Sequence, residues 1–185
     1  AQYASIPVIN MESATGHPLQ ALADALTLLE HPTAHKSKVV LTWAPHPKAL
    51  PHAVGNSFTQ MMQTQGANFV IANPEGYDLD PRITKNIPVF HNQEEALKDA
   101  DFVYAKNWCS YENYGAILRT NDAWMLDSEK MELTNNAKFM HCLPVRRNIV
   151  VADSVLDHPN SLVIEQANNR TFAAQAVLKT LLDHV

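Results

Sequence analysis

Short apolar segments rich in β-branched residues alternate along this chain with segments of helical periodicity. Five of them are typical of strands, at residues 38–44, 68–72, 88–91, 101–105 and 137–142, and a sixth short strand is a candidate at residues 161–164. Between them lie predicted helices at residues 51–65 and 93–100, and a turn with a short helix at residues 74–85. Strands this apolar, each followed by a helix, indicate a parallel sheet covered on both faces. We therefore predict an α/β fold in three layers around a doubly wound parallel sheet.

Two further predicted helices, at residues 19–31 and 171–184, lie outside this repeat. The first has leucines at positions 19, 22, 26 and 29, all at helical spacing. Residues 5–10 are typical of the end of a strand whose neighbours are absent, and a lone strand is not stable by itself. We therefore expect this chain to be the C-terminal part of a longer protein, with both helices bridging to, or packing on, the missing part. A natively trimmed terminus is the alternative.

Composition and glycine placement exclude several classes of protein. The chain has 185 residues, 46% of them hydrophobic, and its formal charge of −5 argues against a nucleic-acid partner. Its two cysteines cannot form a disulfide framework, so we expect a reducing, cytoplasmic compartment. No apolar run approaches the ~18 residues of a membrane helix. The five glycines do not cluster, which argues against a dinucleotide or phosphate-loop site, and Gly66 is predicted to end the helix at 51–65 as a C′ glycine.

The first candidate site is His17 with Gln20, at the start of the helix predicted for residues 19–31. Thr15 is a candidate N-cap, and Pro18 suits the first turn. Residues three apart share a helix face, so an imidazole and a carboxamide would project near a helix N-terminus, which favours negative charge. The alternative is a capped helix with a surface histidine.

The second candidate site is the segment at residues 140–148, where a strand ends in a histidine, a thiol, a turn and two arginines. Three interpretations are open. A zinc site would need more ligands than His141 and Cys142. A Cys142 nucleophile would need an activating base, but neighbours on a strand point to opposite faces. A binding edge would use side chains and the Leu143 carbonyl, which a cis peptide bond before Pro144 would direct.

Charged residues near the same predicted strand ends are candidates for binding ionic groups of a substrate. Arg146, Arg147 and Arg170 carry planar guanidinium groups that suit phosphate and carboxylate. Lys106 directly follows the fourth predicted strand, where it could pair with a carboxylate, and Glu12 could bind an amine or amide. For each of them, a solvated surface charge is the alternative.

Together these residues resemble the aspartate/ornithine carbamoyltransferase family. Residues 17–24 (HPLQALAD) are similar to its His-Pro-x-Gln-x-Leu-Ala-Asp motif, and residues 139–144 (FMHCLP) to the His-Cys-Leu-Pro motif of its ornithine branch. Ordinary ornithine enzymes carry a Ser-Met-Gly loop, but residues 124–127 here are Trp-Met-Leu-Asp, which argues against free ornithine. Residues 42–47, 106–108, 134–136 and 143–148 resemble the N-acylornithine branch, and residues 11–15 look closest to its N-succinylornithine type.

The resemblance implies a two-domain protein. Residues 1–35 would be the end of the carbamoyl-phosphate domain with its linking helix, residues 36–165 the amino-acid-binding domain, and residues 166–185 a C-terminal helix that returns to the first domain. The family's phosphate loop lies in the first domain and is absent from this chain, so we expect the chain alone to be inactive. The family also implies a homotrimer with sites shared between subunits.

The resemblance further implies an enzyme that transfers the carbamoyl group of carbamoyl phosphate to the δ-amine of N-succinyl- or N-acetyl-L-ornithine, in arginine biosynthesis. His17, Gln20, Arg170 and the backbone of Leu143 would contact the carbamoyl group. Cys142 would line the meeting point of the two substrates without acting as a nucleophile.

Two of the remaining candidates belong to the acceptor substrate in this interpretation: Lys106 would hold its carboxylate and Glu12 its amide nitrogen. Pro144 is a further candidate for substrate contact, and Arg146 is a weaker candidate for contact with either substrate. No metal or organic cofactor is expected, because the leaving phosphate is already activated and positioning lowers much of the barrier. No membrane or nucleic-acid partner is expected either.

Three alternatives remain from the sequence. The first is an ordinary ornithine carbamoyltransferase, and the second is a non-catalytic, carbamoyltransferase-like paralogue that binds an amino acid. The third, a generic nucleotide-binding α/β domain, would need a glycine loop that this sequence lacks. The sequence does not reveal whether the acyl group is succinyl or acetyl.

Overall fold

A five-stranded parallel sheet forms the centre of the computed structural model, which describes residues 2–118 and 122–183. Its strands are β1 (Lys38–Trp43), β2 (Asn68–Ala72), β3 (Val89–Phe90), β4 (Phe102–Lys106) and β5 (Lys138–Met140). In space their order is β3-β2-β1-β4-β5, so the chain moves outward from β1 to β3 and then returns to the other side of β1. The strand order therefore reverses between β1 and β4, and open α/β sheets bind ligands at the carboxyl ends of strands at such a point.

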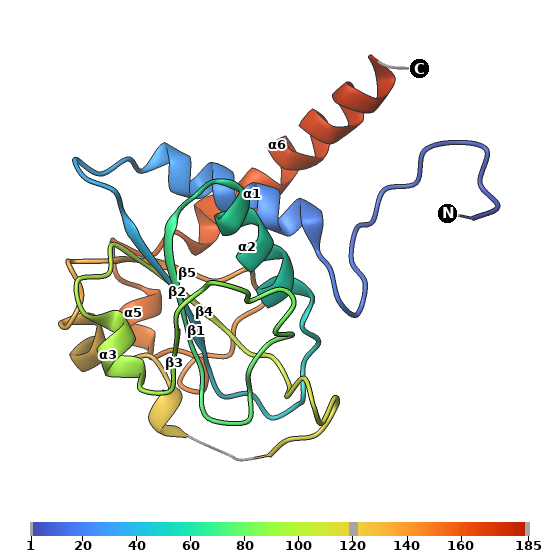
Figure 1. Cartoon of the computed structure of the whole chain (residues 1–185). Coiled ribbons are helices and arrows are strands. Elements are labelled where there is room, and N and C mark those ends of the chain that lie inside the picture. The colour runs from blue at the N-terminus through green and yellow to red at the C-terminus, as the bar shows by residue number, and fades with distance from the viewer. Residues whose placement is uncertain (1, 119–121, 184–185) are drawn as a thin grey trace.

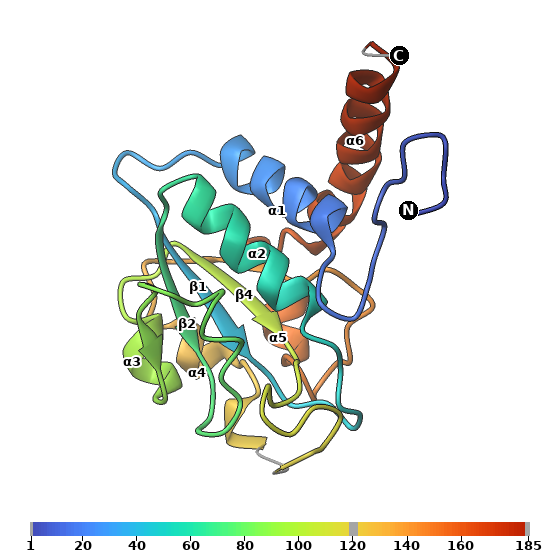
Figure 2. The same ribbon diagram turned by 45° about the vertical axis from the view of Figure 1, so that its right-hand side comes forward.

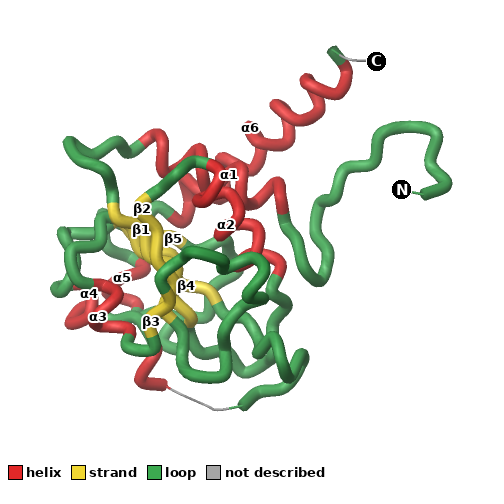
Figure 3. The backbone as a smooth tube through the Cα atoms, in the orientation of Figure 1, coloured by secondary structure: helices red, strands yellow, loops and turns green. Residues whose placement is uncertain are grey.

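Helices cover both faces of this sheet. Helices α1 (Pro18–Glu30) and α2 (Ala53–Thr64) lie on one side, and the short helices α3 (Gln93–Leu97), α4 (Ser128–Met131) and α5 (Asp153–Leu156) lie on the other, as Figures 2 and 3 show. The long helix α6 (Val163–Leu182) packs along α1, and a 3₁₀ turn, η1 (Asp122–Trp124), precedes α4. This arrangement confirms the predicted three-layer, doubly wound α/β fold.

The core follows from strands that are apolar on both faces. Val40 and Leu41 in β1 are both fully buried, as expected for a central parallel strand. From α2, Phe58 packs edge-to-face on Phe69 and on Tyr104, with ring centroids 5.7 and 4.8 Å apart. Gly66 follows the C-cap of α2 with φ of +60°, which confirms its predicted C′ role.

Three local predictions are wrong. Residues 161–164 do not form a strand: Ser161 makes one bridge to Phe139, and the chain then enters α6 at Val163. Residues 74–85 form turns without a helix. Thr15 does not cap α1; His17 occupies the N-cap without a side-chain cap bond, because residues 13–16 close a turn of their own through the Ser13 N–H and the Gly16 carbonyl (2.8 Å).

Two helix boundaries differ from the prediction by three residues or more. The predicted helix at 93–100 ends at Leu97, and Asp99 then adopts a left-handed φ of +57°. The predicted helix at 171–184 begins eight residues earlier, at Val163, and its last residue, His184, lies outside the described residues.

The two ends of the described chain extend away from the sheet (Figure 1). Residues 2–16 have no regular structure and are almost entirely exposed. In α6, Ala173 is the last buried residue, and the remaining turns project from the domain. Exposed apolar side chains on both segments have no cover here: Tyr3, Ile6, Val8, Leu178 and Leu182. None of the helices in the described part of the chain is long and apolar enough to cross a bilayer.

Candidate active site

The two sequence motifs meet at the carboxyl-end edge of β4 and β5. In α1, the Gln20 carboxamide donates to Oδ1 of Asp24 (2.7 Å), and the same oxygen accepts from the carboxamide of Gln166 in α6 (2.7 Å). Gln166 in turn accepts from the backbone N–H of His141 (2.9 Å). A continuous set of buried hydrogen bonds therefore joins the HPLQALAD motif to the segment that follows β5.

His17 lies at the start of α1, almost buried, and its backbone N–H donates to Ser57 Oγ (2.8 Å). Burial lowers the pKa of its imidazole; the positive charges of Arg170 and Lys106 act in the same direction, against the opposing effect of Glu12. The ring is therefore mainly neutral at pH 7. Its Nε2 lies 4.0 Å from a carboxylate oxygen of Glu12, and its Nδ1 is buried without a partner among the described residues.

Lys106 supplies a positive charge at the point between β1 and β4 where the strand order reverses. It ends β4 directly opposite Trp43, the last residue of β1, and its side chain is half-buried. Its ammonium group lowers the pKa values of several neighbours, which places it among both motifs: His17, His46, His141 and Cys142. Arg170 also lowers the pKa of His17, so two positive charges act on this histidine.

The environment of Cys142 fits a residue that lines the site without reacting. Its thiol is buried, and burial raises its pKa, which the charge of Lys106 only partly offsets. The nearest histidine in sequence, His141, uses Nδ1 to accept from the backbone N–H of Leu143 (3.0 Å) instead of activating the thiol. Burial, together with Lys106 and His46, also lowers the pKa of His141 to about 3. A thiolate nucleophile is therefore disfavoured, and the described residues contain no cluster of three groups that could hold a metal ion.

The turn after β5 has the cis peptide bond that the binding-edge interpretation considered. The Leu143-Pro144 peptide bond is cis, and Leu143 has a left-handed φ of +50°. Leu143 is half-buried, whereas Pro144 is exposed. The turn places both residues at the same edge as Cys142.

The two arginines after this turn have different partners. Arg146 donates from Nε to Nε2 of His46 (3.1 Å), in the loop that follows β1, so it faces the strand-order reversal. Arg147 instead forms ion pairs with Asp153 and Asp157, each at 2.7 Å, on the surface of the domain. Arg147 is therefore the solvated surface arginine of the pair.

Sequence reasoning missed several residues of this edge. His46 lies in the segment at residues 42–47, whose resemblance to the N-acylornithine branch gives this histidine no role. In the structure, burial and the charges of Arg146 and Lys106 lower its pKa. Asp24 was quoted in the first motif for its match alone. Gln166 carried no signal in the sequence, because a buried glutamine on a helix cannot be recognised by spacing.

One cavity in the described part of the chain lies away from this edge. It has a volume of about 400 Å³ and opens beside residues 136–137, before β5, with Met131, Phe139 and Val155 in its lining. None of the predicted site residues lines it. This cavity is therefore separate from the candidate site.

Comparison with known proteins supports the motif assignment. A family model for the aspartate/ornithine carbamoyltransferase Asp/Orn-binding domain matches residues 51–181. The chain is 50% identical to the N-succinylornithine carbamoyltransferase of Bacteroides fragilis, across 100% of this chain and 58% of that protein. It is 38% identical to the N-acetylornithine carbamoyltransferase of Xanthomonas campestris, across 98% of this chain and 60% of that protein. The chain thus spans about 60% of the length of these relatives.

Solved structures agree with the sequence relatives. A crystal structure of acetylornithine transcarbamylase complexed with acetylcitrulline superimposes with a TM-score of 0.91 at 38% identity, covering 97% of this chain and 60% of that chain. A mutant of N-acetyl-L-ornithine transcarbamylase, complexed with carbamyl phosphate and N-succinyl-L-norvaline, gives the same TM-score of 0.91 at 37% identity, with the same coverage of 97% and 60%.

Proposed function

This chain belongs to the aspartate/ornithine carbamoyltransferase family, and we propose that the protein containing it transfers the carbamoyl group of carbamoyl phosphate to the δ-amine of N-succinyl- or N-acetyl-L-ornithine. The amine attacks the carbamoyl carbon and forms a new C–N bond, the bond from that carbon to the phosphate oxygen breaks, and the nitrogen loses a proton. The products are an N-acylcitrulline and phosphate.

The observation that carries this proposal is the joining of the two motifs beside Lys106 and Arg170. His17 and Gln20 would face the carbamoyl group, where a neutral imidazole suits hydrogen bonding to an oxygen that gains negative charge as the amine attacks. Arg170 and the Leu143 backbone would complete this part of the pocket. Cys142 would line it without forming a covalent intermediate, which agrees with its buried, raised-pKa thiol.

The acceptor substrate would occupy the edge between β1 and β4. Lys106 would pair with its carboxylate, and Arg146, held by His46, would supply a second cation there. Pro144 lies exposed beside them. Glu12, on the exposed N-terminal segment, would accept a hydrogen bond from the amide nitrogen of the acyl group.

The domain assignment is part of the same proposal. Residues 1–35 would end the carbamoyl-phosphate domain and link it to the amino-acid-binding domain at residues 36–165, and the helix from residue 166 would return to the first domain. The uncovered apolar side chains on residues 2–16 and on the outer turns of α6 support this division. A homotrimer in the cytoplasm completes the proposal, supported for the compartment by the two cysteines, which are both free.

The direct test uses the full-length protein with carbamoyl phosphate and three acceptors: N-succinylornithine, N-acetylornithine and free ornithine. We expect product only from an N-acylated acceptor, measured as the corresponding citrulline by mass spectrometry. Product from free ornithine alone would reject the N-acyl assignment. Absence of product from all three, despite acceptor binding by calorimetry, would favour the non-catalytic paralogue.

A further inference from the structure

Asp24 is a fully buried carboxylate that the proposed reaction does not itself require. Its side chain is 0% exposed, and it lies on α1 one turn after Gln20. Both hydrogen bonds to its Oδ1 are short, at 2.7 Å, and both come from carboxamide donors, Gln20 and Gln166. Burying a carboxylate is costly unless its partners compensate, so two close donors at one oxygen indicate a site built around this charge.

Through Gln166 the carboxylate reaches the second motif. The Gln166 side chain donates to Asp24 with its nitrogen and accepts from the backbone N–H of His141 with its oxygen. Gln166 therefore holds the backbone that carries Cys142 and Leu143 in a fixed orientation relative to Asp24. Gln166 also lies one helical turn before Arg170, so the two side chains share a face of α6.

Tyr104 lies close to the Asp24 carboxylate. Asp24 Oδ2 and the Tyr104 hydroxyl are both buried, and neither makes a hydrogen bond in the described part of the chain. The charge of Asp24 raises the pKa of Tyr104, in addition to the larger effect of burial, and Cys142 acts on the same hydroxyl. Asp24 thus lies between Gln20 on its own helix and the Tyr104–Cys142 pair of the sheet edge.

Helix packing alone does not require this carboxylate. Helices α1 and α6 are also joined by the Asn169 carboxamide, which donates to Thr27 Oγ1 (3.0 Å) and to Glu30 (2.7 Å). Replacing a whole buried polar cluster by apolar side chains is often neutral or stabilising, whereas removing one partner alone is costly. Thr27 Oγ1 also donates to the Ala23 carbonyl in the first motif (2.9 Å), but this contact does not reach the second motif, whereas the Asp24 contacts reach both motifs.

We propose that Asp24 is a positioning residue of carbamoyl transfer: its carboxylate fixes the Gln20 carboxamide and, through Gln166, the backbone of the His141–Leu143 segment in one relative arrangement. This role rests on the proposed function. Asp24 touches no substrate; it acts through Gln20 and through the segment that carries the Leu143 carbonyl.

Ionisation of this carboxylate provides a specific readout. Burial raises the pKa of Asp24 to about 7, against the hydrogen bonds from Gln166 and Gln20, the polar hydroxyl of Tyr104 and the positive charge of Arg170. A proton on the carboxylate weakens both charge-assisted bonds, so kcat should fall as the pH decreases through about 7. The pKa of His17 lies below its usual value of 6.5, so the effect of His17 on the kcat–pH profile should appear at a lower pH than that of Asp24.

The test compares three variants of the full-length protein. Asp24→Leu removes the acceptor, Asp24→Asn keeps an acceptor but removes the charge, and Thr27→Val is the matched control, which breaks the neighbouring contact between the same two helices. We expect Asp24→Leu to lower kcat about 100-fold, the loss that an ångström-scale misplacement produces. Asp24→Asn should lower kcat about tenfold, as expected for one charge-assisted bond.

Further readouts separate positioning from folding. In Asp24→Asn the KM for the acceptor and the thermal unfolding midpoint should stay unchanged, and the kcat–pH profile should lose its step near pH 7. Thr27→Val should keep both kcat and the step. The proposal would be overturned if Asp24→Asn kept the kcat and the kcat–pH profile of the wild type. It would also be overturned if Thr27→Val lost as much kcat as Asp24→Asn. If Asp24→Leu does not fold, Asp24→Asn decides.

Failure of the proposed function is a separate outcome. If the wild-type protein forms no product from any acceptor, the transferase assignment fails, and crystal structures of the wild type and Asp24→Asn at pH values about one unit below and above 7 decide the positioning role. Displacement of the Gln20 carboxamide in the variant, or in the wild type at the lower pH, would support it. An unchanged carboxamide in all of them would reject it.

Discussion

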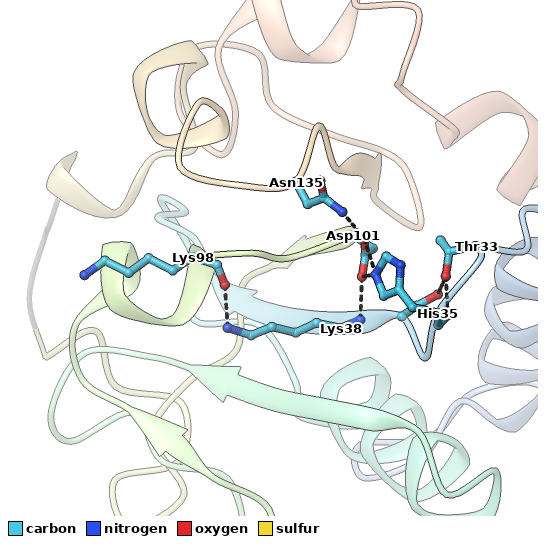
Figure 4. A network of polar contacts seen from close by, with 7 residues as sticks. Thr33, His35, Lys38, Lys98, Asp101 and Asn135 are labelled. Carbon is cyan, nitrogen blue, oxygen red and sulfur yellow. Dashed lines mark hydrogen bonds and ion pairs between the residues drawn. The ribbon is translucent and has the colours of Figure 1, made fainter.

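Asp101 should be the most important carboxylate for the stability of this domain. It precedes β4, and its side chain is 5% exposed. Its Oδ2 accepts from the backbone N–H of Lys38 at the start of β1, and its Oδ1 accepts from the carboxamide of Asn135, both at 2.8 Å. The His35 ring lies 3.0–3.1 Å from the two oxygens, as Figure 4 shows. One carboxylate therefore joins the starts of two central strands to the segment before β5.

The substitution Asp101→Asn has a predictable cost. It replaces one acceptor oxygen by an NH₂ group, so either the Lys38 N–H or the Asn135 carboxamide meets a donor instead of an acceptor. Losing one such bond to a charged group costs about 1.5–3 kcal/mol. His35 adds little, because its side chain is 56% exposed and exposed ion pairs contribute about 0–1 kcal/mol. We expect Asp101→Asn to lower the free energy of unfolding by about 2 kcal/mol.

The effect should depend on pH in a defined direction. Burial alone would raise the pKa of Asp101, but hydrogen bonds from the Lys38 N–H, Asn135 and His35 outweigh it and hold the pKa below 3.8. Because the folded pKa is depressed, the folded protein binds fewer protons than the unfolded chain near pH 4. The stabilisation is therefore complete above the unfolded pKa of about 3.9 and is lost as the pH falls through the lower folded pKa.

Urea denaturation of this chain, followed by tryptophan fluorescence, measures the prediction. With an m value of about 2 kcal/mol/M, the midpoint of Asp101→Asn should be about 1 M lower than that of the wild type at pH 7. The difference should shrink as the pH falls below 4. Asp99→Asn is the control, since Asp99 is exposed and has a left-handed φ that asparagine tolerates. Equal midpoints for Asp101→Asn and wild type at pH 7 would refute the reasoning.

Two further predictions concern the candidate site, and both are measured as steady-state kinetics of the full-length protein. Cys142→Ala should keep kcat within about tenfold of the wild type, whereas loss of a true nucleophile costs on the order of 10⁴ or more; a loss of that size would restore the covalent interpretation. Arg146→Ala should raise the KM for the N-acylornithine, while Arg147→Ala should leave it unchanged, because Arg147 is paired with Asp153 and Asp157 on the surface. A larger effect from Arg147 would reverse this assignment.

The sheet could be predicted from the sequence because its strands are apolar on both faces. The segment at residues 68–72 forms a strand over the whole predicted range, and the segment at 38–44 does so except for its last residue. The sixth predicted strand failed for a physical reason. Leu162 and Val163 are buried against the sheet edge, but they lie at the start of α6, and a short apolar run alone does not distinguish a strand from a buried helix start.

The sequence predicts which residues belong to the candidate site better than it predicts the contacts between them. The motif segments are close together at one edge, and Lys106 lies there as its position after a strand indicated. The sequence does not distinguish the partners of Arg146 from those of Arg147. Their difference depends on His46 at one side and on Asp153 and Asp157 at the other, and only the fold brings these groups near.

Helix α1 shows why the connections within the site escaped the sequence. Its leucines follow helical spacing, and Leu29 among them is 69% exposed, while Gln20, Asp24 and Thr27 are buried. These three polar residues follow the same helical spacing as the leucines, so the helix has two faces of equal periodicity. Hydrophobicity selects the leucine face as the core, but the face against α6 and the sheet is the polar one, because Gln166 and Asn169 satisfy its groups. A helix that buries its polar face in this way aligns the residues of two motifs, and this is why Asp24 is better explained by positioning than by packing.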